Sequence, residues 1–193
     1  MIIFYDLETT GLPKPGDDPL LQPGIVQIGA CLVDPSGWAE EDDGIIAEFN
    51  ENINPELMPD RFEPGAVRVH GLDWNACQPF PSFFTVGMEF AKFSVGATIR
   101  SGYNIIDFDD KILMWQLRRY GMEFNYPWAP RAVDVARLAK ASGRYMGKRG
   151  PKFPKLVELY ADVTGEKLEG AHDALADIRA TVRVARILFS KGF

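Results

Sequence analysis

The stretch FYDLETTGL, residues 4–12, decides the fold prediction. The apolar run of residues 1–7 is interrupted only by Asp6 and predicts a short buried strand. Side chains alternate between the two faces of a strand, so Asp6 and Glu8 project from one face, about 7 Å apart at ~3.3 Å per residue.

Two carboxylates on one buried face predict a divalent cation between them. Buried acids without partners repel each other and lose their hydration, and a cation offsets both effects. Hard oxygen ligands favour Mg²⁺ or Mn²⁺. The alternative is an edge strand whose two acids point into water, because a motif as short as D-x-E has many chance matches.

Length and composition are those of an ordinary globular domain. The 193 residues are 46% hydrophobic and 25% charged, so we expect a single domain over residues 1–193. No basic segment precedes the short N-terminal apolar run, so neither a signal peptide nor a membrane span is predicted. Cys31 and Cys77 have no second cysteine or histidine at metal-binding spacing, which indicates a reducing, cytoplasmic protein without a disulfide framework or a zinc site.

The net charge of −6 argues against a nucleic-acid partner, but the charges are unevenly distributed. Residues 1–60 hold thirteen acids and one base, Lys14, whereas residues 61–193 hold fourteen acids and twenty bases. Residues 137–155 hold seven bases and no acid. This basic segment, with its interspersed glycines, is either a solvated loop or a flexible phosphate-binding loop. Its candidate phosphate contacts are Lys148, Arg149 and Lys152.

The rest of the chain alternates strand and helix patterns. Residues 13–23 are too rich in proline, glycine and aspartate for regular structure and predict a loop. The first three strands predict a meander, and a later strand feeds a helix near residues 104–109, a common place for chemistry in α/β folds. Strands are predicted at 25–33, 45–52, 98–103 and 132–135, and helices at 83–93, about 104–119, 136–141, 155–163 and 173–189. Within residues 63–72, a short helix is predicted to begin after Pro64 and to end in a turn at His70 and Gly71.

The segment AHDALADIRAT, residues 171–181, carries a histidine and an acid five residues apart. Inside one helix, His172 and Asp177 would diverge by about 140° at ~100° per residue. Both can face the first strand if His172 precedes the helix, Asp173 is the N-cap and Asp177 lies one turn in. The alternatives are a surface or capping histidine and an aspartate that favours the helix macrodipole.

Three motifs in this chain order resemble the DEDDh family of 3′–5′ exonucleases: D-L-E at 6–8, N-I-I-D-F-D at 104–109 and H-x4-D at 172–177. Within that family, GYNIIDFDD, PGAVRVHGL and AHDALADIRATVRVARIL are most similar to the nuclease domain of bacterial exonuclease I. The resemblance runs from Ile3 to about Leu188. Exonuclease I carries two further domains beyond its nuclease, and this sequence stops after its last predicted helix, so we do not expect high processivity.

The resemblance implies an α/β protein of the ribonuclease-H-like fold, with a five-stranded mixed sheet flanked by helices. It implies that Asp6, Glu8, Asp109 and Asp177 bind two divalent cations, Mg²⁺ or Mn²⁺, and that His172 is the general base. The implied reaction is two-metal hydrolysis of single-stranded DNA from its 3′ end, with release of nucleoside 5′-monophosphates.

The resemblance also implies substrate contacts near the strand ends. Relatives hold the terminal nucleotide just after the first acids, where Leu12 can wedge between the last two bases. For His70, a simple turn residue is the alternative. The candidate substrate contacts are Thr9, Thr10, Leu12, His70 and Asn104.

Three further acids lie near the motifs without belonging to them. Asp107 and Asp110 flank Asp109, and we expect both to be solvated. Asp134 lies at a predicted strand, and we expect it to be structural.

Two rival functions remain open. An RNA-trimming nuclease of the ribonuclease T or oligoribonuclease type uses the same five catalytic positions. A polymerase-associated proofreading or binding subunit is the other, although an inactive fold of this kind usually lacks one of the acids or the histidine. We favour single-stranded DNA over RNA as the partner, with replication or repair proteins as further partners and no membrane.

Overall fold

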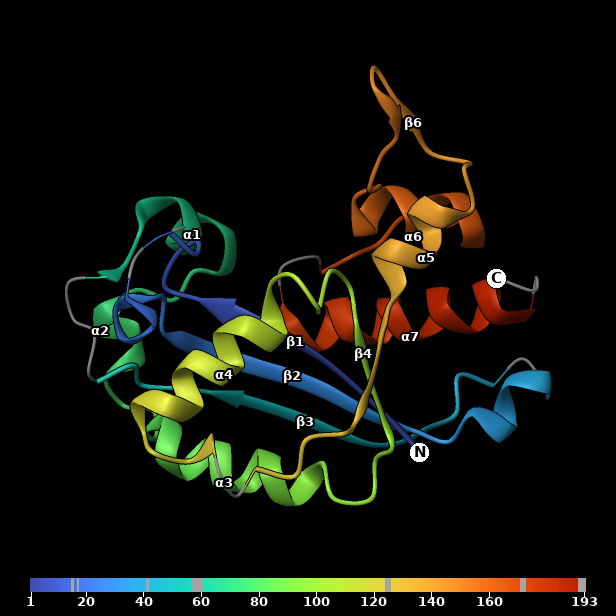
Figure 1. Cartoon of the computed structure of the whole chain (residues 1–193). Helices are drawn as coiled ribbons and strands as arrows, with labels where there is room; N and C mark the ends of the chain where they lie inside the picture. Colours follow the sequence, from blue (N-terminus) through green and yellow to red (C-terminus); the bar gives the residue numbers. More distant parts are fainter. Residues whose placement is uncertain are drawn as a thin grey trace.

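A mixed sheet of five strands, in the order β3-β2-β1-β4-β5, forms the centre of the protein (Figure 1). The computed structural model describes residues 1–14, 16, 18–40, 42–56, 61–123, 126–170 and 173–190. β2 pairs antiparallel with β1 and β3, whereas β4 pairs parallel with β1 and β5. The strands are β1 Ile2–Thr9, β2 Ile25–Val33, β3 Ile45–Asn52, β4 Ile99–Gly102 and β5 Arg131–Asp134. The predicted meander and the predicted mixed sheet are confirmed.

Helices cover both faces of this sheet. α3 and α4 pack on one face, and α5, α6 and α7 pack on the other. No helix in the described ranges is both long and apolar enough to cross a bilayer. The helices are α1 Pro64–His70, α2 Trp74–Cys77, α3 Phe83–Phe93, α4 Asp109–Arg119, α5 Val135–Ala141, α6 Leu156–Thr164 and α7 Ala174–Ser190, with 3-10 helices η1 Pro19–Leu21 and η2 Pro35–Glu40.

The alternation of β1 divides the core and sets the direction of its acids. Ile3, Tyr5 and Leu7 pack beneath α3 and α4. Ile2 and Phe4 pack with α7 on the opposite face. Because Asp6 and Glu8 continue the register of Ile2 and Phe4, they emerge on the α7 side of the sheet. The prediction that both acids share one face is therefore confirmed.

Most predicted boundaries are correct within two residues, and the exceptions cluster around turns. β1 continues to Thr9, so Glu8 lies within the strand. The predicted helix at 104–119 begins only at Asp109, because residues 103–108 form bends and turns. The loop predicted at 13–23 contains the short η1. The basic segment predicted as a flexible loop contains a small hairpin, β6 Met146–Gly147 and β7 Gly150–Pro151.

Candidate active site

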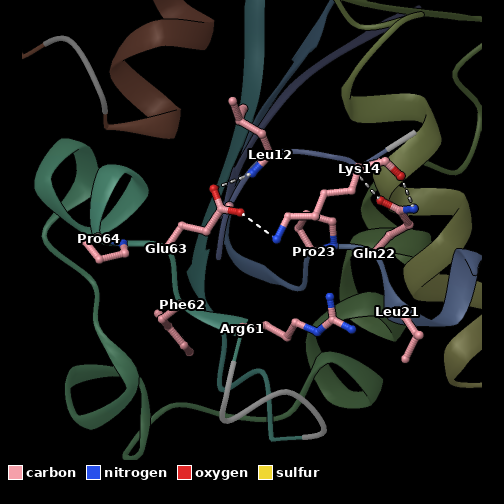
Figure 2. Close-up of a pocket in the computed structure, with 10 residues that line it drawn as sticks. Leu12, Lys14, Leu21, Gln22, Pro23, Arg61, Phe62, Glu63 and Pro64 are labelled. Carbon is pink, nitrogen blue, oxygen red and sulfur yellow. Dashed lines mark hydrogen bonds and ion pairs between the residues drawn. The ribbon is translucent and has the colours of Figure 1, made fainter. Parts of the chain in front are cut away.

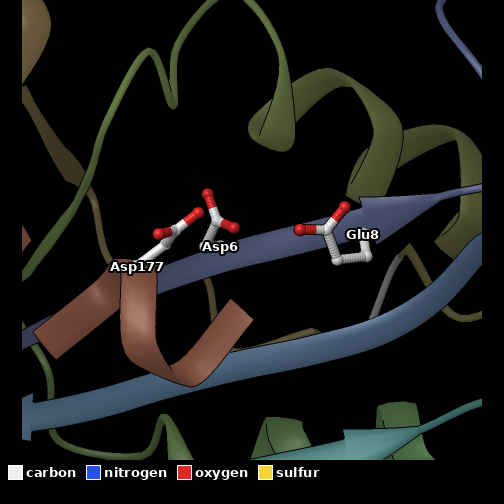
Figure 3. Close-up of side chains that lie close together, drawn as sticks. All are labelled: Asp6, Glu8 and Asp177. Carbon is white, nitrogen blue, oxygen red and sulfur yellow. The ribbon is translucent and has the colours of Figure 1, made fainter. Parts of the chain in front are cut away.

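Three carboxylates from the two ends of the chain meet near the end of β1 (Figure 3). Asp6, Glu8 and Asp177 each offer one oxygen, and these oxygens lie within 4.8 Å of one another. All three side chains are partly buried. Figure 3 shows Asp177 reaching from α7 toward the two acids of β1. We call these three residues the acid cluster.

The close approach of α7 to the sheet depends on two residues of β2. A Cβ atom at Gly29 would lie 2.3 Å from the backbone carbonyl carbon of Ala174, so any larger residue would push the helix away. The Ala174 N–H donates to Oε1 of Gln27 at 3.3 Å, and Nε2 of Gln27 donates to Asp173 at 3.4 Å. The sequence analysis missed both residues, although a glutamine and a glycine inside an apolar strand were the available signal.

The first turn of α7 has the predicted geometry. The Asp173 carboxylate accepts the Ala176 N–H at 2.9 Å and so caps the helix. The Asp177 N–H bonds the Asp173 carbonyl at 2.9 Å, which places Asp177 one turn in. His172 lies outside the described residues, so its role as general base stays a prediction.

Asp109 lies beside the acid cluster at the first position of α4. Its side chain is almost completely buried, and Oδ1 accepts the Leu7 N–H at 3.1 Å. This bond ties the start of α4 to β1, next to Asp6 in the sequence. The fourth predicted metal ligand therefore lies near Asp6, whose pKa its charge raises, but it is not one of the three acids whose oxygens come within 4.8 Å of one another. One of its oxygens accepts a hydrogen bond from the β1 backbone.

Burial and the charges of nearby acids raise the pKa values of Asp6, Glu8 and Asp109. Burial raises the pKa of Asp6 well above its ordinary value, and the charges of Asp109, Glu8 and Asp177 raise it further. Burial, followed by the charges of Asp177 and Asp173, raises the pKa of Glu8 from 4.5 to about 8. Burial also raises the pKa of Asp109, against the lowering effect of the N–H bonds to its carboxylate. Acids that disfavour their own ionisation in this way are suited to bind divalent cations, whose charge reverses the penalty.

The neighbouring acids have partners within the chain. The prediction that Asp110 is solvated is wrong: it is 9% exposed and accepts hydrogen bonds from the Tyr5 hydroxyl at 2.5 Å and from Nε of Arg100 at 3.1 Å. The sequence pattern could not indicate the bond to Tyr5, because Tyr5 lies 105 positions before Asp110. Asp107 is exposed, as predicted, and pairs with Arg137 at 2.7 Å.

Asp134 is structural, as predicted. It is 3% exposed, and its carboxylate accepts the N–H groups of Asn104, Ile106 and Arg137 at 3.1–3.3 Å. It thereby caps α5 and holds the turn after β4. Asn104 in this turn has a φ of 62°, the only positive φ of a non-glycine residue in the described ranges. Its side chain is exposed.

A cavity of about 320 Å³ adjoins the acid cluster at Glu8. We call it the nucleotide cavity after the predicted substrate contacts that line it. Three of the predicted substrate contacts, Thr9, Leu12 and His70, line it. Leu12 is 67% exposed at its rim. The His70 Nδ1 accepts the Leu72 N–H, so His70 also stabilises the turn after α1. Its Nε2 lies 3.1 Å from the Thr9 carbonyl oxygen.

Thr10 and Asn104, the other two predicted contacts, do not line this cavity. Thr10 is completely buried, and its hydroxyl accepts the Gly24 N–H at 3.1 Å. Its side chain therefore holds the loop that follows β1.

The basic segment divides into paired and unpaired cations. Lys152 bonds Glu158 at 2.9 Å. Lys148 and Arg149 lie in the turn of the β6–β7 hairpin, which projects from the body of the protein (Figure 1). Both are exposed, and neither makes a hydrogen bond or ion pair with the part of the chain that is described.

Comparisons with known proteins agree with this geometry. The Exonuclease (RNase T) family matches residues 3–185. The uncharacterized exonuclease CP81 of Escherichia phage 186 is 31% identical over 98% of this chain and 89% of its own length. Exodeoxyribonuclease I of Haemophilus influenzae is 26% identical over 97% of this chain, but over only 40% of its own length. E. coli exonuclease I in complex with a dT13 oligonucleotide superposes with a TM-score of 0.72 at 23% identity, over 97% of this chain and 40% of that one. The chain therefore spans less than half of the two larger enzymes, and the superposition shows a shared fold.

Proposed function

Because the chain belongs to the Exonuclease family that matches residues 3–185, we propose that it is a metal-dependent 3′–5′ exonuclease of single-stranded DNA that releases nucleoside 5′-monophosphates. The observation that carries the proposal is the convergence of Asp6, Glu8 and Asp177 beside the nucleotide cavity. The fold likeness to an E. coli enzyme solved with dT13 supports a single-stranded DNA substrate.

Two divalent cations, Mg²⁺ or Mn²⁺, are the proposed cofactors. Asp6, Glu8 and Asp177 would hold them, together with the nearby Asp109. When bound, the cations would supply positive charge that activates a water and offsets charge on the phosphate and on the leaving 3′ oxygen. The all-carboxylate donor set and its raised pKa values support this assignment.

The residues of the chain position the strand and move the proton. In the proposed mechanism His172 accepts the proton of the attacking water, since a histidine of ordinary pKa does this near neutral pH. The nucleotide cavity holds the terminal nucleotide, with Leu12 against its base. Thr9 and His70 help to shape the cavity, and their mutual contact at 3.1 Å keeps the end of β1 against α1.

We also propose that residues 1–193 act as one domain in the cytoplasm. The two cores lie on opposite faces of one sheet and share β1, which supports a single folding unit. Cys31 and Cys77 are both free and buried, which supports a reducing compartment.

Digestion of end-labelled substrates tests the function. We expect stepwise shortening of single-stranded DNA from its 3′ end in Mg²⁺, weak digestion of duplex DNA, and no digestion in chelator. Absence of metal-dependent cleavage of every substrate would contradict the proposal. Faster removal of ribonucleotides from a matched RNA oligomer would replace it with the RNA-trimming alternative.

A further inference from the structure

A second cavity, of about 150 Å³, adjoins the nucleotide cavity (Figure 2). Gly11, Leu12 and Glu63 line both cavities and so form a common wall between them. The remaining lining comes from the loop after Leu12 and from residues 61–64 at the start of α1. A strand that enters the nucleotide cavity therefore passes close to this second space.

Basic side chains line the second cavity. Lys14 and Arg61 line it, and Figure 2 shows the Arg61 guanidinium directed into the space. Arg61 makes no hydrogen bond or ion pair with any described residue, whereas Lys14 pairs with Glu63 at 3.3 Å. Arg119, which donates to the Gln22 carbonyl at 2.7 Å, lies behind the lining loop and adds a third positive charge.

Hydrogen bonds hold the residues that line the second cavity in place. The Lys14 N–H donates to Oε1 of Gln22 at 3.0 Å, and the Gln22 amide returns a bond to the Lys14 carbonyl at 2.9 Å. Gln22 is 4% exposed, so these two hydrogen bonds are shielded from water. Glu63 is equally fixed, because its N–H bonds the Thr10 carbonyl at 2.7 Å and a Cβ at Gly11 would lie only 2.6 Å from its side chain.

The basic side chains of the second cavity stand out because the surrounding sequence is acidic. Lys14 is the only base among residues 1–60, which hold thirteen acids. A phosphate chain approaching the acid cluster meets unfavourable negative charge, and cations one cavity away counter it. A guanidinium that makes no ion pair with a described residue, as at Arg61, can bind a phosphate through two parallel N–H bonds.

We propose that the second cavity is a phosphate subsite, in which Arg61 and Lys14 bind the phosphate on the 5′ side of the penultimate nucleotide. This inference rests on the proposed exonuclease function. With the terminal nucleotide in the nucleotide cavity and the scissile phosphate at the acid cluster, the next phosphate lies one nucleotide farther along the strand. Leu12 separates the two nucleotides and stands at the rim of both cavities.

Three short thymidine compounds test the subsite: TpT, which has only the scissile phosphate, and pTpT and TpTpT, which add the next one. Their inhibition constants are measured against cleavage of a labelled oligothymidylate. In the unaltered protein we expect pTpT and TpTpT to bind about tenfold more tightly than TpT, as for one charge-assisted contact. In Arg61→Gln this advantage disappears while the constant for TpT stays unchanged, and Arg61→Lys keeps part of it.

Arg131→Gln is the matched control, because Arg131 is exposed at the opposite end of the parallel strands. It should leave all three constants unchanged. The subsite is overturned if Arg61→Gln keeps the advantage, if the unaltered protein has none, or if Arg61→Gln weakens TpT equally. A protein that cleaves no oligothymidylate in Mg²⁺ contradicts the proposed function instead, and direct binding of pTpT and TpT then decides the subsite by the same ratio.

Discussion

Asp109 and Asp110 are neighbours in the sequence, yet they belong to two groups of acids with opposite surroundings. Asp110 receives hydrogen bonds from Tyr5 and Arg100, so the chain itself supplies its partners. Asp6, one position beyond Tyr5, faces Asp109, Glu8 and Asp177, whose charges all raise its pKa. The first kind of acid stabilises the fold, whereas acids of the second kind raise one another's pKa values and are the proposed ligands of a cation.

The strongest test of this contrast removes one member of the acid cluster. We expect Asp177→Asn to lower metal-supported kcat/KM by at least ~10³-fold, about 4 kcal/mol of transition-state stabilisation, because the amide is a poorer cation ligand. The measurement is cleavage of end-labelled single-stranded DNA in Mg²⁺. Circular dichroism should show an unchanged fold. Turnover like that of the unaltered protein would remove Asp177 from the proposed site.

The matched test removes the partnered acid. We expect Asp110→Asn to lower the free energy of unfolding by about 3 kcal/mol, because it leaves the charge of Arg100 without its partner in a largely buried position. Urea denaturation measures this change. Activity per folded molecule should change only a few-fold, and Asp107→Asn, which breaks an exposed pair, should cost less than ~1 kcal/mol. A fully stable Asp110→Asn protein would break the contrast.

The two groups of acids also differ in how well the sequence predicted them. Alternation along β1 placed Asp6 and Glu8 on one face, and helix capping placed Asp173 and Asp177, because both rules act over a few neighbouring residues. The partners of Asp110 could not be predicted, since its bond to Tyr5 joins residues 105 positions apart.

Close packing was equally invisible in the sequence. Gly29 allows α7 to touch β2, but this role depends on a backbone 145 positions away, at Ala174. The small β6–β7 hairpin and the second cavity likewise arise from contacts between segments whose local patterns indicate only loops. Long-range contacts thus determine which charged groups gain partners and which stay available to a ligand.

The same contrast applies to the bases of the basic segment. We expect the double variant Lys148→Glu/Arg149→Glu to weaken single-stranded DNA binding about tenfold and to reduce the salt slope by about 1.4, at ~0.7 per lost phosphate contact. Lys152→Gln should have a smaller effect, because Lys152 already pairs with Glu158. Fluorescence anisotropy across a salt series measures both quantities. An unchanged salt slope in the double variant would mean that Lys148 and Arg149 do not contact the DNA phosphates.

The smallest expected effect is on stability, and it concerns Glu8. Its pKa in the folded protein is raised to about 8 from 4.5, so the folded state holds a proton that the unfolded state has lost between these pH values. The free energy of unfolding must therefore fall as pH rises through this window. Between pH 6.5 and 8, in chelator, we expect a loss of about 1 kcal/mol after allowance for solvent screening, or ~2–4 °C in Tm.

Asp6 and Asp109, whose pKa values are also raised by burial, change the free energy of unfolding in the same direction as Glu8. The lowered pKa of His70 opposes the trend mainly below its ordinary value of 6.5, and the Cys31 thiol, whose ordinary pKa is 9.0, titrates above the window. Glu8→Gln should flatten the profile, and Mg²⁺ should raise Tm more at pH 8 than at pH 6.5, because cations compete with protons for the same oxygens. A Tm that rises with pH in chelator would contradict the raised pKa of Glu8 in the folded protein.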